Sequence, residues 1–231
     1  MGGVNIYPNG YSTANCTAAY VAKKANGTIV MITAGHCIWG SGGASTTWKH
    51  GSSRVVGESL GVVFSDGKVA DVGMIEIASI LGQMDPVNQF MKGRSGPDIT
   101  TLVGTLDGEN QFINDTVCRF GTTSFKDCGP IKKKLVANES VATNLAGVTV
   151  SRTITKTMEL DFDSEPGDSG GPVYSQNGNG IGYGLHVHSW VQGDALPKRS
   201  WYSPLDRAKA ALLNADPGPN VTISWCLNDP C

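Results

Sequence analysis

The chain has 231 residues and a net charge of −2, from 18 basic and 20 acidic residues. Its one basic cluster, Lys132–Lys134, is short and has no aromatic neighbours, so no nucleic-acid partner is expected. No apolar run approaches the roughly 20 residues of a membrane-spanning helix, so no membrane partner is expected either. With 30 glycines and 11 prolines, the composition is that of a turn-rich globular protein.

Short apolar runs rich in β-branched residues follow one another along the chain. They lie at 18–22, 28–34, 54–64, 71–77, 147–162, 171–175 and 181–191, and Gly, Asn, Asp and Ser separate them. Many short strands at close spacing predict an all-β sandwich or barrel. One helix is expected over 203–215, where apolar residues recur at helical spacing. The stretch GRSGPD at 93–98 suggests two domains, 1–97 and 98–231.

Six cysteines stand at positions 16, 37, 118, 128, 226 and 231, and none lies in a zinc-type pattern. We therefore expect three disulfides, an oxidising compartment, and neither metal nor cofactor. The spacing favours Cys118 with Cys128 and Cys226 with Cys231, which leaves Cys16 with Cys37; other connectivities stay open. The N-terminal residues lack the charged region and the apolar core of a signal peptide. If the protein is exported, we expect its signal peptide to have been removed before this sequence begins.

The stretch SEPGDSGGPVYS at 164–175 sets Ser169 in a glycine-rich turn. In one interpretation this is an ordinary turn, in which glycine and serine are common for backbone reasons; in the other, the turn presents Ser169 as a nucleophile. It also fits the G-x-S-x-G elbow of α/β-hydrolases, but that fold needs an acid and then a histidine after the serine. No Asp or Glu separates Ser169 from the later His186 and His188. The α/β-hydrolase interpretation therefore fails.

The reverse order of residues fits a serine nucleophile. His36 ends a predicted strand in the motif TAGHC, and Asp71 opens the run DVGMIEI, with Asp66 as a nearby alternative. A serine hydroxyl needs an imidazole to accept its proton and a buried carboxylate to orient that imidazole. The sequence therefore predicts a triad of His36, Asp71 and Ser169. The N–H groups of Gly167 and Ser169 are expected to hold the oxyanion.

These motifs resemble the chymotrypsin-like serine proteases, and more closely the actinobacterial streptogrisin and α-lytic protease branch. They are TAGHC at 33–37, Asp71 before an apolar strand, VCRFGTTSFKDCG at 117–129, EPGDSGGPVYS at 165–175 and WYSPLDRAKAAL at 201–212. The resemblance implies two six-stranded antiparallel β-barrels, the first with His36 and Asp71, the second with Ser169 and a C-terminal helix. It also implies a secreted, monomeric bacterial endopeptidase that acts on polypeptides and loses a pro-segment.

The resemblance also bears on the residue before the nucleophile. In this branch an arginine of a Cys-Arg motif neutralises that aspartate, and Cys118-Arg119 matches the motif. A buried ion pair between Arg119 and Asp168 is implied, since an unpaired buried charge is costly. The chain departs from the branch at Asp163, which stands where relatives have a cysteine that braces the specificity pocket.

Two histidines in GYGLHVHSWV bear on which bond is cut. His186 and His188 are two residues apart, so in a regular strand they share one face. If Gly184-Leu185-His186 aligns with the Gly-Ile-His of glutamate-specific relatives, His186 lines the primary specificity pocket. If Ser189-Trp190 aligns with the Ser-Trp of trypsin-like enzymes, His188 lines that pocket instead. Ser164 matches a carboxylate-binding position of the glutamate-specific relatives. Cleavage after Glu is therefore expected.

Three alternatives stay open. Aligned without gaps to trypsin's Asp-Ser-x-x-Gly-Asp-Ser, Asp163 lies at the pocket base and selects Lys or Arg. The two histidines lie on a surface edge strand in another interpretation. A catalytically silent homologue would instead bind a partner through the protease fold, although all three triad residues are present.

Overall fold

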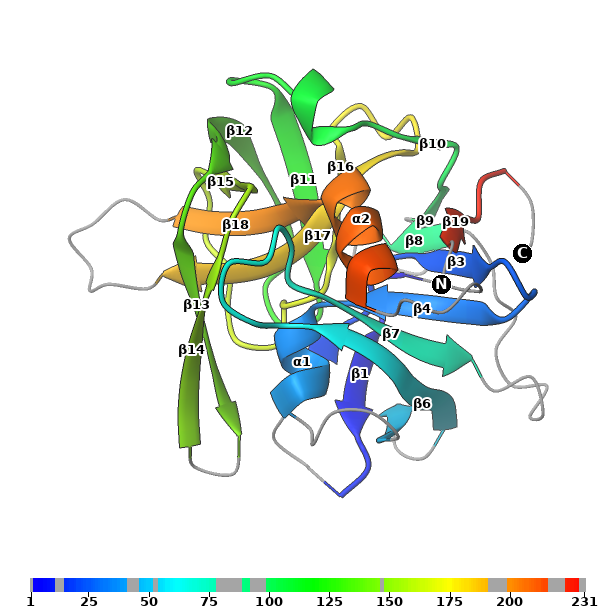
Figure 1. The fold of residues 1–231 in the computed structure, drawn as a ribbon. Coiled ribbons are helices and arrows are strands. Elements are labelled where there is room, and N and C mark those ends of the chain that lie inside the picture. The colour runs from blue at the N-terminus through cyan, green and yellow to red at the C-terminus, as the bar shows by residue number, and fades with distance from the viewer. Residues whose placement is uncertain are drawn as a thin grey trace.

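The computed structural model describes residues 2–10, 15–40, 46–51, 54–77, 89–91, 99–145, 148–190, 199–215 and 223–228. Two barrel-like β-sheets and a helix near the C-terminus dominate these residues (Figure 1). The expected chymotrypsin-like, all-β fold is confirmed. The boundary expected at residue 97 lies outside the described residues.

The first sheet comes mainly from the first half of the chain. Its strands are β1 (Asn5–Pro8), β2 (Cys16–Thr17), β3 (Val21–Lys24), β4 (Ile29–Thr33), β5 (Thr47–His50), β6 (Arg54–Val63), β7 (Val72–Ile77) and β19 (Ile223–Trp225). Their order is β19-β3-β4-β7-β6-β5-β1-β2, which among the described residues is an open half-barrel. The short helix α1 (Gly35–Gly40) follows β4 directly.

The second sheet is a closed barrel. Its strands are β10 (Gly104–Thr105), β11 (Thr116–Gly121), β12 (Phe125–Val136), β15 (Thr157–Leu160), β16 (Pro172–Ser175), β17 (Ile181–Trp190) and β18 (Arg199–Pro204). The order is β10-β17-β16-β11-β12-β15-β18, and a further pairing of β17 with β18 closes six strands into a ring. The short strand β10 adds to β17 in parallel, outside that ring.

Helix α2 (Leu205–Ala215) lies in front of both sheets in Figure 1 and packs against β6 and β7 of one and β17 and β18 of the other. Its residues Leu205, Ala208 and Leu212 are buried, as their helical spacing predicts. The helix begins two residues later than expected, because Ser203 and Pro204 still pair with β17 as part of β18.

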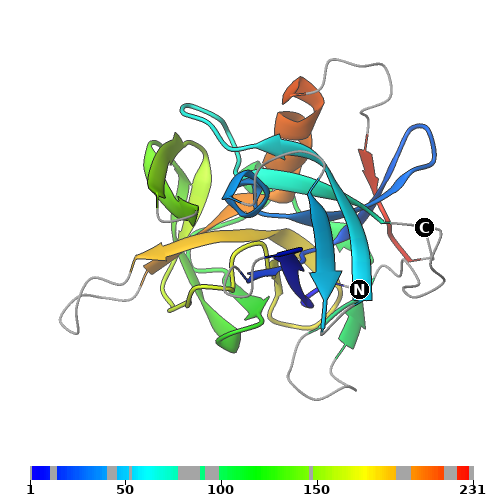
Figure 2. The same ribbon diagram turned by 90° about the horizontal axis from the view of Figure 1, so that it is seen from below.

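A hairpin of β13 (Glu139–Leu145) and β14 (Val148–Ile154) extends from the second barrel alongside α1 (Figure 2). It is tied to the turn after β6: Thr153 N–H donates to Asp66 Oδ1, and Gly67 N–H donates to the Thr153 carbonyl oxygen, both at 2.8 Å. The hairpin thus connects the second barrel to the segment that leads into Asp71. The remaining described elements are β8 (Gln89–Met91), β9 (Ile99–Thr101) and the 3₁₀ turn η2 (Gly108–Asn110).

Candidate active site

Ser169 lies on the turn between β15 and β16. Gly167 has φ +105°, and a Cβ atom there would lie 2.4 Å from Thr123 Oγ1. Gly170 has φ +86°, and its Cβ would lie 2.1 Å from Thr33 Oγ1. Both positions require glycine, because the backbone is left-handed and no side chain has room. The two glycines therefore let the turn pack closely on its neighbours, with Ser169 between them.

Hydrogen bonds from two threonines fix this turn. Thr17 N–H donates to the Ser169 carbonyl oxygen at 2.8 Å, and Thr17 Oγ1 donates to the Gly167 carbonyl oxygen at 2.7 Å. Thr122 Oγ1 donates to the same Gly167 oxygen at 3.2 Å. The N–H groups of Gly167 and Ser169 have no acceptor among the described residues. Two fixed, free N–H groups are what an oxyanion hole requires.

His36 stands in α1, and Asp71 directly precedes β7. His36 Nδ1 lies 2.5 Å from Asp71 Oδ2, and the His36 backbone N–H donates to Asp71 Oδ1 at 2.8 Å. Asp71 is fully buried, and its own N–H donates to Ser203 Oγ at 3.2 Å. A carboxylate can only accept in this contact, so the geometry favours the His36 tautomer with its proton on Nδ1 and a lone pair on Nε2. This is the tautomer that a general base needs.

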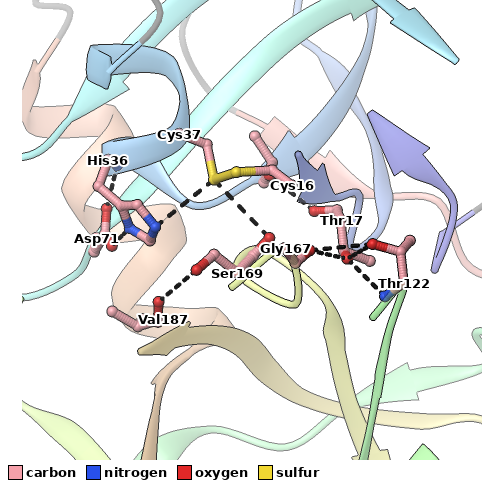
Figure 3. Close-up of a disulfide and its surroundings, with 10 residues drawn as sticks. Cys16, Thr17, His36, Cys37, Asp71, Thr122, Gly167, Ser169 and Val187 are labelled. Atoms are coloured by element: carbon pink, nitrogen blue, oxygen red, sulfur yellow. Dashed lines mark hydrogen bonds and ion pairs between the residues drawn. A yellow bond between two sulfur atoms is a disulfide. The ribbon is translucent and has the colours of Figure 1, made fainter. Parts of the chain in front are cut away.

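The Ser169 hydroxyl is bonded to a carbonyl rather than to His36. Ser169 Oγ donates to the Val187 oxygen at 3.1 Å, whereas His36 Nε2 lies 3.8 Å from Cys37 Sγ (Figure 3). The two segments still meet, because Cys37 Sγ is 3.9 Å from the Ser169 carbonyl oxygen. A change of the Ser169 χ1 rotamer would break the hydrogen bond to Val187 and would need no movement of the backbone. The sequence gives no signal for this role of Val187, since a main-chain atom carries it.

Arg119 and Asp168 form the ion pair that the Cys-Arg motif implies. Arg119 Nη1 lies 2.9 Å from Asp168 Oδ2 with both side chains fully buried, a close charge contact without an aligned hydrogen bond. Asp168 also accepts the N–H groups of Thr123 and Glu165 at 2.9 Å and of Ser124 at 3.1 Å. Burial lowers the pKa of Arg119, and the Asp168 charge opposes that shift. The pair fixes the backbone next to Ser169.

A second polar cluster adjoins the Ser169 turn. His186 exchanges two backbone hydrogen bonds of 2.7 Å with Gly170 and Gly171, which places β17 beside the turn. His186 Nε2 lies 2.8 Å from Ser164 Oγ, and Ser189 Oγ donates to the Ser164 carbonyl oxygen at 2.7 Å. Burial lowers the pKa of His186 well below its usual range, and nearby cationic groups add to the shift. The ring is therefore neutral at pH 7.

His188 belongs to a different environment, and the expectation that both histidines share one face is wrong. A β-bulge lies between them: His186 pairs with Tyr202, but His188 pairs with the adjacent Trp201. His188 stacks on that indole, with ring centroids 5.9 Å apart and planes at 16°. Burial lowers the pKa of His188 to about 4. Because of the bulge, Ser189, and not His188, lies on the same face of β17 as His186.

Asp163 is engaged with its neighbours. Its Oδ1 accepts the Ser164 N–H at 3.0 Å, and its carbonyl oxygen accepts Arg119 Nη2 at 3.1 Å. The Asp163 carboxylate also raises the pKa of Arg119, so the two charges interact.

Disulfides join Cys16 to Cys37 and Cys118 to Cys128, at S–S distances of 2.01 and 2.03 Å. Cys226 is also disulfide-bonded, whereas Cys231 lies outside the described residues. Figure 3 shows the first disulfide between His36 and the turn of Ser169. Within the described ranges, no group of three or more His, Cys, Asp or Glu side chains is arranged to hold a metal ion. No helix in those ranges is long and apolar enough to span a membrane.

Three solved structures share this fold. The Nocardiopsis protease has a TM-score of 0.67 at 22% identity, over 97% of each chain. A glutamic acid-specific serine protease that uses a histidine triad in substrate binding has a TM-score of 0.67 at 20% identity, over 91% of this chain and 96% of its own. Thermobifida fusca protease A has a TM-score of 0.63 at 22% identity, over 91% and 94%. No curated protein matches.

The barrels and the buried His36–Asp71 pair are those of a chymotrypsin-like serine protease. The sequence matches the trypsin family over residues 7–212, and the chain belongs to that family. It is a serine endopeptidase, and its substrates are polypeptides.

Proposed function

We propose that Ser169 is the nucleophile, His36 the general base and Asp71 the residue that orients it. The observation that carries this proposal is the His36–Asp71 contact of 2.5 Å, next to a turn whose Gly167 and Ser169 N–H groups have no acceptor among the described residues. In the first step Ser169 Oγ leaves Val187, gives its proton to His36 Nε2 and attacks the scissile carbonyl carbon. The oxyanion that forms accepts hydrogen bonds from Gly167 and Ser169.

The imidazolium then gives its proton to the leaving amine, the C–N bond breaks, and an acyl-enzyme on Ser169 Oγ remains. Water, deprotonated by His36, attacks the ester carbonyl carbon. Release of the carboxylic acid returns the proton to Ser169, so the enzyme is regenerated. Asp71 stays ionised throughout and stabilises the positive charge on His36.

Covalent labelling tests the nucleophile. A phosphonylating reagent should modify the wild-type protein once per chain, at Ser169, and should leave Ser169→Ala unmodified. Peptide mapping by mass spectrometry reads out the site. Absence of labelling in the wild type would favour the partner-binding alternative and overturn the assignment.

We further infer that the enzyme cleaves after Glu. Support comes from the Ser164–His186 contact beside the Ser169 turn and from the absence of a charged partner on His186 in the described residues. A substrate carboxylate here would favour protonation of His186. A hydrogen bond assisted by charge contributes about 1.5–3 kcal/mol, or about 10- to 150-fold in discrimination.

The glutamic acid-specific relative of similar fold uses a histidine triad, and this chain has a different set of groups. It has four histidines in all: His36 pairs with Asp71, His50 Nδ1 contacts the Asn5 carbonyl oxygen, and His188 stacks on Trp201. Among the described residues, none of the other three histidines forms a hydrogen bond with His186. Serine hydroxyls have to supply the remaining donors.

Specificity for Lys or Arg through Asp163 is the second candidate. The interaction of Asp163 with Arg119 disfavours it, because a carboxylate already near a cation attracts a second one less strongly. A panel of peptides that differ only at the residue before the scissile bond separates the two candidates. Highest kcat/KM for Glu supports our proposal, and highest kcat/KM for Lys or Arg overturns it.

The pH dependence gives an independent check. We expect the ratio of kcat/KM for Glu to that for Gln to rise only below neutrality, as pH falls from about 6.5 to about 5, because burial lowers the pKa of His186 and the protonated ring then pairs with the carboxylate. A ratio that falls over this range would contradict the role of His186.

We also propose that the enzyme is secreted and works as a monomer, and that its source is bacterial. The disulfides support export, since such bonds persist in oxidising compartments. Loss of a pro-segment during maturation belongs to the same proposal. Sequencing the N-terminus of enzyme isolated from the source medium, with size-exclusion chromatography, tests all of these points.

A further inference from the structure

The dipeptide Asn-Gly occurs four times in the chain, at 9–10, 26–27, 177–178 and 179–180. It is chemically labile, because the glycine nitrogen can attack the amide carbon of the Asn side chain with no side chain of its own in the way. The attack requires a glycine N–H that no acceptor holds, and space in which a five-membered ring can close. The structure separates the four dipeptides by these two requirements.

Two of the dipeptides fail the first requirement. Gly27 N–H donates to the Lys24 carbonyl oxygen at 2.9 Å, and Gly178 N–H donates to the Ser175 carbonyl oxygen at 3.2 Å. Each of these hydrogen bonds must open before the nitrogen can react, which lowers the reactive population by up to about 10-fold. Both asparagines are therefore protected by the turns that contain them.

The last dipeptide fails the second requirement. Gly180 is buried, and a Cβ atom there would lie 2.2 Å from the Thr101 carbonyl oxygen. The Gly180 carbonyl oxygen accepts the Val103 N–H at 2.9 Å. Asn179 Oδ1 is itself occupied, because it accepts the Ile181 N–H at 3.3 Å. Ring closure at this dipeptide would have to displace packed backbone.

Asn9-Gly10 meets both requirements. The dipeptide forms the turn directly after β1, and both of its residues are exposed. Asn9 N–H donates to the Thr47 carbonyl oxygen at 2.8 Å, whereas the Gly10 N–H has no acceptor among the described residues. No heavy atom lies within 4 Å of a Cβ atom placed at Gly10. The nitrogen is thus free, and the space for ring closure is open.

We propose that Asn9 is a site of spontaneous deamidation through a cyclic imide with Gly10. The Gly10 nitrogen gives up its proton and bonds to Asn9 Cγ, and the side-chain amide leaves as ammonia with that proton. Water then opens the succinimide ring. Attack at the side-chain carbonyl carbon gives aspartate, and attack at the main-chain carbonyl carbon gives isoaspartate, in which the chain runs through the side chain. Each event adds one negative charge to the net charge of −2.

A cation on the neighbouring strand faces the new charge. Tyr7 of β1 pairs with Lys49 of β5, and Asn9 bonds to Thr47 of the same strand. Pro8 is buried between them, so alternation places Tyr7 and Asn9 together on the outer face. Lys49 is then the diagonal neighbour of Asn9, and its ammonium group has no ion pair among the described residues. The carboxylate formed at position 9 is therefore within reach of an unpaired cation, which favours the ionised product.

Peptide mapping tests the proposal. The Ser169→Ala protein, used to avoid self-digestion, is kept folded in mildly alkaline buffer made with water enriched in heavy oxygen. Mass spectrometry then measures the label that ring opening leaves at each Asn. We expect residue 9 to convert about 5-fold or more faster than residues 26, 177 and 179, because its glycine nitrogen alone is free. Equal or faster conversion at any of these three residues would overturn the proposal.

The same measurement in denaturant shows whether the fold sets this order. In the unfolded chain all four glycine N–H groups lose their protein partners, so the four asparagines should convert at similar rates. If residue 9 leads by the same factor in the unfolded chain, the local sequence controls the reaction and the structural assignment fails.

Two variants of the Ser169→Ala protein serve as matched controls in isoelectric focusing. Asn9→Gln should suppress the more acidic form that appears with time, because the longer side chain must close a six-membered ring. Asn177→Gln should leave the rate of its appearance unchanged, and Asn9→Asp marks its position. If Asn9→Gln accumulates the acidic form as fast as its parent, the charge arises elsewhere and the inference fails.

Discussion

At the scale of single residues, the triad is the first assignment to test. We expect His36→Ala, Asp71→Asn and Ser169→Ala each to fold normally and to lose about 10⁴-fold or more in kcat, because the three groups act as a unit. Steady-state hydrolysis of a peptide ester, with circular dichroism as a check on folding, measures the effect. Near-normal hydrolysis by Asp71→Asn would mean that another carboxylate orients His36.

Arg119 should contribute to stability through Asp168. Removal of its charge leaves a fully buried carboxylate without its cation, and such a change costs about 3–5 kcal/mol. Denaturant unfolding of Arg119→Ala gives the value. Arg152→Ala is the control, since Arg152 is one-third exposed and 3.8 Å from Asp66, and should lose under about 1 kcal/mol. Equal losses in the two variants would contradict this prediction.

His188 should make the protein sensitive to acid. Its pKa falls from 6.5 to about 4 on folding, so between these values the unfolded chain binds a proton that the folded chain excludes. Stability therefore decreases as pH falls through this window, by up to about 3 kcal/mol for this group. His188→Gln should show a smaller decrease between pH of about 7 and about 4. Parallel stability curves for the two proteins would show that His188 does not contribute.

At the scale of elements, the hairpin β13–β14 links both sides of the active site. Val141 and Ile154 are fully buried in one cluster with Phe64 and Val187. The Phe64 ring lies edge-on to His36, with centroids 5.9 Å apart. Val187 supplies the carbonyl oxygen that accepts the Ser169 hydroxyl. The packing of this hairpin therefore bears on the positions of both His36 and Ser169.

Truncation of the hairpin cluster should reduce turnover as well as stability. Ile154→Ala and Ile131→Ala each remove a fully buried side chain and should cost about 2–5 kcal/mol. Only Ile154→Ala should also lower kcat, about 10-fold or more, with KM little changed, because Ile131 packs in the interior of the second barrel instead. Values of kcat and KM, measured for both variants well below their unfolding temperatures, show whether only Ile154→Ala lowers kcat. The same kcat for both variants would disprove a positioning role.

The elements also show how far the sequence predicts the fold and the site. The TAGHC motif and Asp71 predict the pair that the structure shows between His36 and Asp71, and the GDSGGP motif predicts the glycine turn that carries Ser169. The run 147–162 becomes two strands, since the left-handed Lys156, with φ +62°, ends one before the other begins. Nothing in residues 125–145 predicts β12 and β13, because the lysine-rich stretch has no clear alternation.

The proposed specificity pocket is the part that sequence periodicity misplaces. In a regular strand, His186 and His188 would lie on the same face. The extra residue of the bulge in β17 puts Ser189 on the His186 face instead. A bulge depends on how β17 meets β18, which is a tertiary property. The place of Ser189 therefore emerges from the register of two strands and not from any local motif.

At the scale of the whole molecule, the end of the chain returns to the first sheet. After α2, β19 pairs with β3, and Ile223 is fully buried in the core cluster that contains residues of both sheets. Ile223→Ala should cost about 2–5 kcal/mol and should lower the stability of both barrels together. Tryptophan fluorescence and far-ultraviolet circular dichroism should then report one common transition. Separate transitions would show that the barrels unfold independently.

The strand β19 also bears on the resistance of the enzyme to digestion by other copies of itself. In a concentrated solution a peptidase meets other copies of itself continually, and each copy is digested when a segment opens long enough to enter a neighbour's active site. Here the C-terminal strand is paired with β3, and the Trp225 ring packs edge-on against Tyr20, with centroids 6.4 Å apart. We therefore expect the pairing of β19 with β3 to keep residues 223–225 closed to the active sites of other copies.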